Sequence, residues 1–315
     1  MELWLIILLA FLFLFLLPTM VLSSIIYTKL LIRTTKKKWG RECSIPEDEE
    51  YRRMFDIGIE WDQTYADRKT SVSIQSGRFH LVGEYFDFGA DRAVIIIAGR
   101  MESLLYSYFF AEPYRAAGYN VLVIDNRAHG LSDGVINSLG YREYKDILAW
   151  GRFLHDEHGN RSVVLHGICI GSSAGLFALT HKKCPDYMTA LVAEGMYPTF
   201  GESFINHMKV DHRPLFPFAY ETEFYMWAIS GANVVTDGPV KRIRRMKKPV
   251  LFLHSRQDVF STPDKAQMLY DTCPAKHKRL VWFPVGDHSR VRINDPDGYD
   301  QSIKTFLSEL ETIEK

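Results

Sequence analysis

The chain has 315 residues, with 38 basic and 38 acidic side chains, so its formal net charge is zero. This balance supplies no excess of positive charge, and composition gives no reason to expect nucleic-acid binding. Hydrophobic residues make up 47% of the chain, which suits one large packed domain. The sequence contains no cluster of cysteine and histidine at zinc-ligand spacing, so we expect neither a metal nor another cofactor.

The first 28 residues predict a transmembrane anchor. Leu3 to Thr28 contains no charged residue. As a helix these residues would extend about 39 Å, against about 30 Å for the hydrocarbon core of a bilayer. A cleaved signal peptide is the alternative, but Glu2 stands where a signal peptide carries a basic residue, and no small-residue cleavage site follows. Pro18 is expected to kink the helix, as membrane helices tolerate.

The charges that flank the anchor predict its orientation. No basic side chain precedes it, whereas six follow it within a few residues: Lys29, Arg33, Lys36, Lys37, Lys38 and Arg41. The positive-inside rule therefore predicts a single-pass membrane protein whose remaining chain faces the cytoplasm. Residues 29–69 are interpreted as a charged linker and lead-in. Because no core strand is expected in residues 1–28, their removal is expected to leave a soluble domain whose triad chemistry survives.

Residues 70–315 are predicted to form one α/β domain. Residues 71–75 and 79–86 look like an opening β-hairpin, after a helix within residues 50–65. Apolar strands then alternate with amphipathic helical segments such as residues 144–154 and 303–310. Such alternation predicts a mostly parallel central sheet with helices on both faces.

The sequence Gly167-Ile168-Cys169-Ile170-Gly171 joins an apolar strand to a helix. A strand, a turn of the form G-x-nucleophile-x-G and a helix make a nucleophile elbow, here with cysteine at the usual position of serine. The helix N-terminus favours an anion and thus a reactive thiolate. Cys169 is our candidate nucleophile. The alternatives are a buried structural thiol in a protein without catalysis, or Ser173, which lies about one helical turn later.

Two further residues complete a candidate triad. Asp258 follows the apolar segment 249–254, and His288 follows the segment 280–283. Parallel strands place such residues at one edge of the sheet. Asp258 would fix the tautomer of His288, and His288 would exchange a proton with the thiol. Glu194, at the end of another strand, is the competing acid. With Cys169 assigned to chemistry, three cysteines are left and we expect no disulfide.

From residue 70 to about 312 the chain resembles the α/β-hydrolase superfamily. The resemblance rests on the elbow and on the chain order of Cys169, Asp258 and His288. In addition, segment 93–100 is similar to the family's strand with the oxyanion loop, and segment 118–134 is similar to its next strand with the D-x-R-G-x-G-x-S turn. It implies an α/β-hydrolase fold, a small cap at about residues 196–245, and an oxyanion hole from the backbone N–H groups of Ile170 and Arg100. The cysteine itself resembles that of dienelactone hydrolases and of the acyl-CoA thioesterase and bile-acid acyltransferase group.

These features predict a membrane-anchored hydrolase that cleaves an ester or thioester through a Cys-His-Asp triad and an acyl-enzyme. Aromatic residues of the cap either line a pocket for a small-molecule or lipid-like acyl substrate or only attach the cap to the domain. An acyltransferase or peptidase with the same triad, and a binding protein of this fold without catalysis, remain as alternatives.

Overall fold

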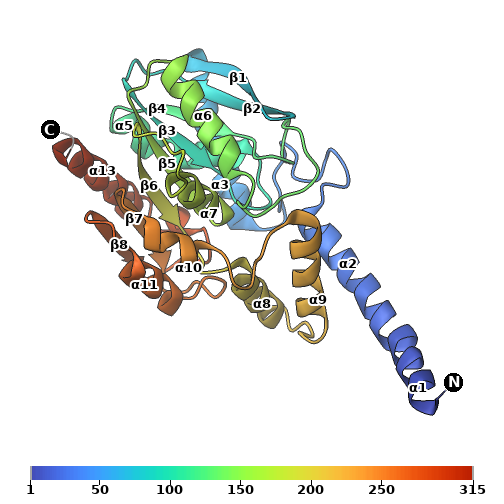
Figure 1. The fold of residues 1–315 in the computed structure, drawn as a ribbon. Coiled ribbons are helices and arrows are strands. Elements are labelled where there is room, and N and C mark those ends of the chain that lie inside the picture. The colour runs from blue at the N-terminus through green and yellow to red at the C-terminus, as the bar shows by residue number, and fades with distance from the viewer. Residues whose placement is uncertain (1, 314–315) are drawn as a thin grey trace.

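The computed structural model describes residues 2 to 313, and an eight-stranded sheet forms the centre of the molecule (Figure 1). The strands are β1 (Lys69–Ser76), β2 (Phe79–Phe86), β3 (Arg92–Ile97), β4 (Asn120–Ile124), β5 (Ser162–Ile168), β6 (Met188–Glu194), β7 (Val250–Ser255) and β8 (Lys278–Phe283). Their order across the sheet is β1-β2-β4-β3-β5-β6-β7-β8.

The sheet has the predicted hairpin at one edge and is otherwise parallel. Strand β1 pairs antiparallel with β2, and β2 pairs antiparallel with β4. From β4 through β3, β5, β6 and β7 to β8 every neighbouring pair is parallel. The carboxyl ends of β3 to β8 therefore meet at one edge, which is where open α/β sheets place their ligands. The predicted mostly parallel sheet is confirmed.

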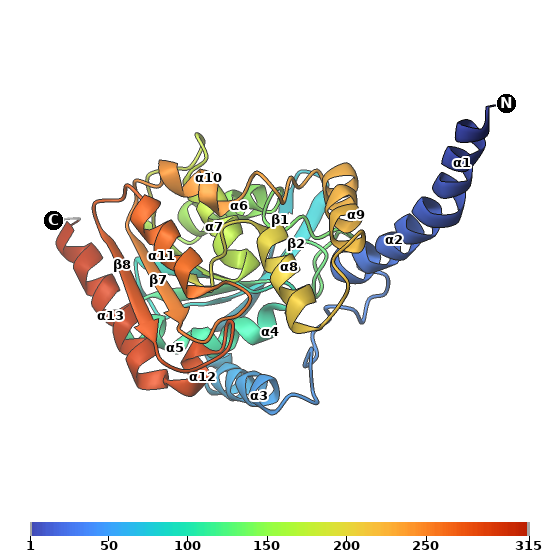
Figure 2. The same cartoon turned by 90° about the horizontal axis from the view of Figure 1, so that it is seen from below.

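Helices cover both faces of the sheet (Figure 2). One apolar core lies between the sheet and α6 (Tyr144–Asp156), α7 (Ile170–Leu179), α10 (Pro239–Arg242) and α11 (Pro263–Thr272). The other lies between the sheet and α3 (Glu49–Thr64), α4 (Leu104–Ser107), α5 (Glu112–Ala116), α12 (Val291–Asn294) and α13 (Pro296–Ile313). Because both faces are covered, β4 and β5 are buried along their whole length, as expected for interior parallel strands.

A cap region lies between β6 and β7. It contains α8 (Phe200–Val210), α9 (Phe218–Tyr225) and a π-helical turn at Met226–Ser230. The buried side chains of this cap join a third apolar cluster, separate from the two beside the sheet. Its members come from the cap, from the loop before α6, from the start of α7 and from the N-terminal helix. The cap is thus attached to the molecule on several sides.

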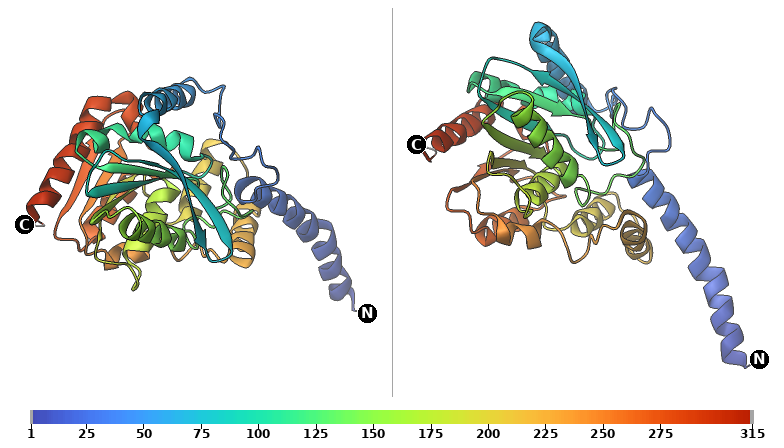
Figure 3. Two further views of the ribbon diagram at one scale, coloured as in Figure 1. Left: turned by 90° about the horizontal axis from the view of Figure 1, so that it is seen from above. Right: turned by 45° about the horizontal axis from the view of Figure 1, so that its top comes forward.

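The N-terminal segment is one long apolar helix, formed by α1 (Leu3–Phe11), a π-helical turn at Leu12–Leu16 and α2 (Leu17–Leu31). By length and composition it could cross a membrane. The helix projects away from the domain, and the N- and C-terminal ends lie on opposite sides of the molecule (Figure 3). Its first half, to Leu17, contains no buried residue among those described.

The last part of this helix packs against the cap instead of standing free. Thr19, Ser23, Tyr27 and Leu31, four residues apart, are its buried residues, and this spacing places them on one helix face. Helix α9 lies alongside α2 (Figures 1 and 2). The hydroxyls of Thr19 and Ser23 donate hydrogen bonds of 2.8 and 2.7 Å to the carboxylate of Glu221 on α9.

The segment after the helix also packs on the domain. Arg33 donates hydrogen bonds to the carbonyl oxygens of Gly130 and Ser132, and Arg41 forms ion pairs with Glu84 and Asp125. The linker predicted here from charge and proline content is therefore held along part of its length.

The structure agrees with the expectation that residues 1–28 contain no core strand, but it shows that this segment contributes to the packing of the cap. Tyr27 is only 2% exposed and belongs to the cap cluster. Its hydroxyl makes a 2.8 Å hydrogen bond with Ser230 of the cap. Removal of residues 1–28 therefore uncovers part of the cap.

Candidate active site

The elbow at Cys169 has the strained backbone that its glycine pattern predicts. Cys169 lies between β5 and α7 with φ 54° and ψ −111°. Residues other than glycine rarely adopt this backbone conformation. A Cβ atom on Gly171 would overlap the carbonyl oxygen of Ile97, and one on Gly167 would overlap the backbone of Gly171 and Ser172. The two glycines therefore allow strand, turn and helix to approach closely.

Asp258 and His288 meet at the same edge of the sheet, in the loops after β7 and β8. The Nδ1 atom of His288 donates a 2.7 Å hydrogen bond to Oδ2 of Asp258. The other oxygen, Oδ1, accepts hydrogen bonds from the backbone N–H groups of Phe260 and Ser261 at 2.9 and 2.8 Å. The carboxylate is thereby fixed in position, and it fixes the orientation of the imidazole ring in turn.

The electrostatics of this pair favour a charged histidine. Burial by itself would lower the pKa of His288, but the carboxylate of Asp258 and then the thiol of Cys169 raise the pKa well above its ordinary value. Burial would raise the pKa of Asp258, but the charge and hydrogen bond of His288 hold it below its ordinary value. The pair is therefore suited to exist as imidazolium and carboxylate at neutral pH.

The second ring nitrogen of His288, Nε2, is the one available for proton exchange. It is buried and has no partner at full hydrogen-bond geometry among residues 2 to 313, but Cys169 is near enough to raise the pKa of the ring through its charge and through a looser hydrogen bond. Gly195, with φ 60°, leaves room for the ring, since a Cβ there would lie 2.9 Å from Cε1 of His288. The structure thus brings Cys169, His288 and Asp258 together.

The two residues predicted to form an oxyanion hole lie at the start of α7 and in the loop after β3. Ile170 is the first residue of α7, where backbone N–H groups have no partner within the helix. Arg100 lies in the loop after β3. Among the described residues, none accepts a hydrogen bond from either backbone N–H, so both remain available to a developing negative charge.

Two polar side chains hold the oxyanion loop, and sequence reasoning did not assign them this role. Asn126 donates a 3.1 Å hydrogen bond to the carbonyl of Ala98. His129 places Nε2 2.8 Å from the carbonyl of Arg100 and Nδ1 2.9 Å from that of Arg127. Burial lowers the pKa of His129. The signal in the sequence was the position of both residues in the turn after β4.

The alternative site residues lie elsewhere. Ser173 is buried within α7, one turn beyond the elbow. Glu194, at the end of β6, accepts a 2.5 Å hydrogen bond from the hydroxyl of Tyr299 and makes none to His288. Burial raises the pKa of Glu194 to about 7. Its side chain is a neighbour of the candidate triad, but Asp258 is the partner of the histidine.

The side chain of Arg100 contacts the N-terminal helix. Its Nη1 donates a 3.3 Å hydrogen bond to the carbonyl of Leu30, near the C-terminal end of α2, where helix carbonyls lack partners. Cys169 also packs against the cap cluster that contains Tyr27 and Leu31. The N-terminal helix is therefore part of the surroundings of the candidate nucleophile, which sequence reasoning did not foresee.

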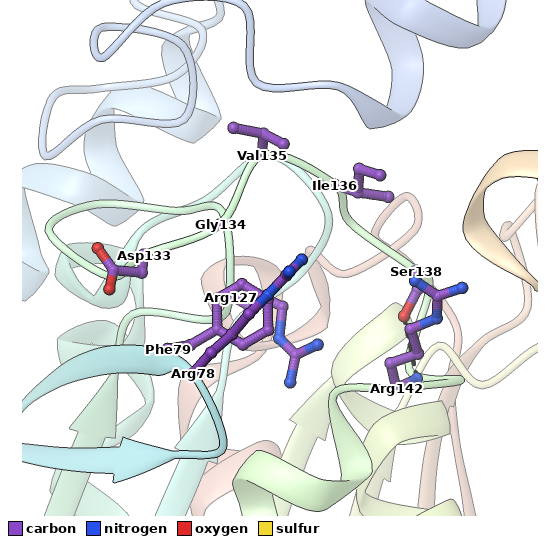
Figure 4. A pocket seen from close by; sticks show the side chains of 9 residues that line it. All are labelled: Arg78, Phe79, Arg127, Asp133, Gly134, Val135, Ile136, Ser138 and Arg142. Atoms are coloured by element: carbon purple, nitrogen blue, oxygen red, sulfur yellow. Dashed lines mark hydrogen bonds between the residues drawn. The ribbon is translucent and has the colours of Figure 1, made fainter.

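A separate cavity of about 360 Å³ lies beside the loop that follows β4 (Figure 4). Arg78, Arg127 and Arg142 line it, and Figure 4 shows Arg127 close to the ring of Phe79. Arg127 is already paired with Asp146 at 2.8 Å. None of the residues that line this cavity belongs to the candidate triad.

Comparison with known proteins agrees with the fold. A model of the α/β-hydrolase fold family matches residues 92–217. An esterase of Pyrococcus furiosus superposes with a TM-score of 0.68 at 22% identity, over 79% of this chain and 93% of its own. An α/β-hydrolase of Vibrio vulnificus gives a TM-score of 0.63 at 15% identity, over 90% and 93% of the two chains. The chain has the α/β-hydrolase fold, and the predicted fold class is confirmed.

Two relatives by sequence have no stated activity. An uncharacterized protein of Bacillus subtilis, YqkD, is 26% identical over 220 residues, which are 69% of this chain and 71% of the relative. An uncharacterized membrane protein of Saccharomyces cerevisiae is 24% identical over 196 residues, 62% of this chain and 63% of the relative. Their names state no family and no reaction, so the support for the α/β-hydrolase superfamily comes from the family model and the solved structures.

Proposed function

We propose that this protein is a membrane-anchored hydrolase that cleaves a carboxylic ester or thioester with Cys169 as the nucleophile. The observation that carries the proposal is the hydrogen bond from His288 to Asp258 beside a cysteine with a positive φ at a strand-to-helix elbow. The resemblance in fold to esterases supports the reaction class.

The chemistry follows from the positions of the three side chains. The thiolate of Cys169 attacks the carbonyl carbon, and the carbonyl oxygen takes the negative charge, stabilised by the N–H groups of Ile170 and Arg100. As the bond to the leaving alcohol or thiol breaks, that group takes the proton from Nε2 of His288. Water then loses a proton to His288, attacks the acyl-cysteine, and releases the acid and the thiolate. Asp258 stabilises the imidazolium in both steps.

Membrane anchoring is supported by the apolar helix Leu3–Leu31 and by the yeast relative, which is named a membrane protein. The basic residues after this helix support a cytoplasmic domain. Protease added to sealed right-side-out vesicles is expected to leave the domain intact, and digestion from outside would contradict the orientation.

The decisive experiment concerns the nucleophile. In the full-length protein in detergent or nanodiscs, Cys169→Ala is expected to reduce hydrolysis of 4-methylumbelliferyl esters by at least about 10³-fold, as loss of a nucleophile does. Cys169→Ser is expected to retain low activity, because the site is built for a group that ionises readily. Ser173→Ala is the matched control and should keep most activity. A thiol-reactive acyl probe should modify Cys169, and full activity of Cys169→Ala would reject the proposal.

The acceptor of the acyl group distinguishes a hydrolase from an acyltransferase or a peptidase with the same triad. Burst kinetics with an added amine or alcohol measures how the acyl-enzyme partitions. Water is expected to remain the main acceptor at millimolar concentrations of added nucleophile. Preferred transfer to the added nucleophile would assign the protein to the acyltransferases.

A further inference from the structure

A second cavity lies between the N-terminal helix and the cap. It has a volume of about 360 Å³, within the range of about 300–1,000 Å³ that small-ligand sites occupy. Leu22, Ile25, Ile26, Lys29 and Leu30 of α2 line one side. Met208 at the end of α8, Phe218 at the start of α9, and Arg213 and Pro214 between them line the other. All but two of these residues are apolar.

One wall of the cavity belongs to the same apolar cluster that packs against Cys169. Met208 is a buried member of the cap cluster, and Ile26, Leu30 and Phe218 pack against it. Ile170 belongs to the same cluster, and Cys169 packs against it as well. Apolar side chains thus extend from the cavity wall to the candidate nucleophile and to the first residue of the predicted oxyanion hole.

The position of the cavity along the helix corresponds to the surface of a bilayer. About 20 helical residues cross the hydrocarbon core. A helix that enters the core at Leu3 therefore leaves it at about Leu22. The helix carries no buried residue before Thr19, so the domain leaves Leu3 to Pro18 uncovered and packs on the helix only near the end of the stretch that lies among lipid tails. The cavity begins at Leu22, where the hydrocarbon core ends and the ester groups of membrane lipids are found.

Exposed aromatic residues lie on and next to α9, the cap helix that packs along α2. Phe216 is 72% exposed, Tyr220 59% and Trp227 58%, and helix α9 lies alongside α2 (Figure 2). Aromatic residues of this kind are enriched where proteins meet the boundary between lipid and water. A cap that touches this boundary would open the cavity toward lipid.

We infer that the cavity between α2 and the cap binds the acyl chain of a membrane lipid and presents its ester or thioester carbonyl to Cys169. This inference rests on the proposed function and names its substrate class. The N-terminal helix then forms one wall of the substrate site in addition to anchoring the protein. Lys29 and Arg213 are the two charged residues of the lining and would supply positive charge to an anionic headgroup, with Arg213 also paired with Asp211 at 2.9 Å.

The test uses the full-length protein in nanodiscs, with 4-methylumbelliferyl palmitate in the bilayer and 4-methylumbelliferyl acetate in water. Leu22 lines the cavity and is 50% exposed, so Leu22→Trp narrows the cavity without overfilling a packed core. We expect at least a tenfold lower kcat/KM for palmitate and less than a twofold change for acetate. Leu14→Trp, at a residue of the same helix that is 75% exposed, is the matched control and should change neither value.

Failure of this inference is distinguishable from failure of the proposed function. If Cys169→Ala abolishes hydrolysis but Leu22→Trp lowers both esters equally, or neither, the acyl site is wrong and the nucleophile stands. A second measurement does not require turnover: a palmitoyl lipid with a diazirine in its chain is photolysed in the nanodisc and the labelled residues are mapped. Labels at Leu22–Leu30 and Met208–Phe218 that decrease in Leu22→Trp support the site, and labels confined to residues 3–17 overturn it.

Discussion

The carboxyl edge of the sheet and the junction between the N-terminal helix and the cap both surround Cys169, but they are built in different ways. At the sheet edge each functional residue follows a buried strand, and the strands hold one another through regular pairing. At the junction, segments nearly 200 residues apart meet through hydroxyl–carboxylate bonds and an apolar cluster. Regular pairing gives a rigid edge for chemistry, whereas the junction depends on a few specific contacts.

The comparison predicts that the largest effects lie at the sheet edge. Asp258→Asn should lower kcat by at least about 10³-fold, because the amide neither fixes the same tautomer nor stabilises imidazolium. Asp258 is the main cause of the raised pKa of His288, so the alkaline limb of the pH–rate profile, where the ring loses its proton, should move to lower pH by at least about one unit.

The control for that variant is Asp264→Asn, at an exposed aspartate in the first turn of α11. Its kcat and pH profile should match those of the wild type. Unchanged activity of Asp258→Asn would show that Glu194 or another group supports His288.

The elbow itself is predicted to tolerate no added side-chain atom. Gly171→Ala forces a Cβ onto the carbonyl oxygen of Ile97 and should lower the free energy of unfolding by at least about 3 kcal/mol. Gly175→Ala, one turn later, meets only the side-chain end of Leu191 at 2.9 Å, and its effect should stay within about 1 kcal/mol. Chemical unfolding in detergent measures both, and equal effects would contradict the close-approach argument.

Glu194 should make the stability of the domain depend on pH. Its pKa is about 7 in the folded protein, against an ordinary value of 4.5. Between these pH values the folded state retains a proton that the unfolded state has lost, so stability falls as pH rises from about 4.5 to about 7. The loss is on the order of 3 kcal/mol. Glu194→Gln should remove it, so that the variant gains stability relative to wild type between pH 5 and pH 8. A constant difference across this range would contradict the prediction.

The junction is expected to show the smallest effect. Thr19→Val combined with Ser23→Ala removes both hydrogen bonds to Glu221 and should destabilise the protein by about 1–2 kcal/mol, the cost of a part-buried carboxylate left without partners. Ser24→Ala is the control, since its hydroxyl bonds only to the carbonyl of Val21 on the same helix. Thermal unfolding in nanodiscs compares the two, and identical midpoints would show that the junction is not held by these bonds.

The sheet edge could be predicted from the sequence because its signals are local. Gly167 and Gly171 flank Cys169 at fixed spacing, and Asp258 and His288 each follow an apolar run, so strand direction alone brings them to one edge. The structure adds the distances and the preference for Asp258 over Glu194, which depend on the loops after β7 and β8.

The junction between the N-terminal helix and the cap could not be predicted, because the pattern of hydroxyl residues on the helix has more than one explanation when the cap is not known. Thr19, Ser23 and Tyr27 recur every four residues and mark one helix face, but hydroxyl side chains in an apolar helix can also bond to their own backbone, as Thr28 does to Ser24. Only the folded cap brings Glu221 and Ser230 to that face. The same holds for His129, whose contact with the oxyanion loop requires the neighbouring strand to be in place.

The packing of α2 on the cap limits which part of the N-terminal helix can be replaced by another sequence, in an engineered chimera or in a relative. An anchor that only tethers a domain can be exchanged for any apolar helix of similar length. Here the exchangeable unit ends near Leu17, because from Thr19 onward one face of the helix is buried against the domain. A chimera joined after Leu17 keeps every contact of the cap, whereas one joined after Thr28 replaces a wall of the domain with foreign sequence. Relatives that retain the cap are therefore expected to vary freely before Leu17 and to covary with α9 after it.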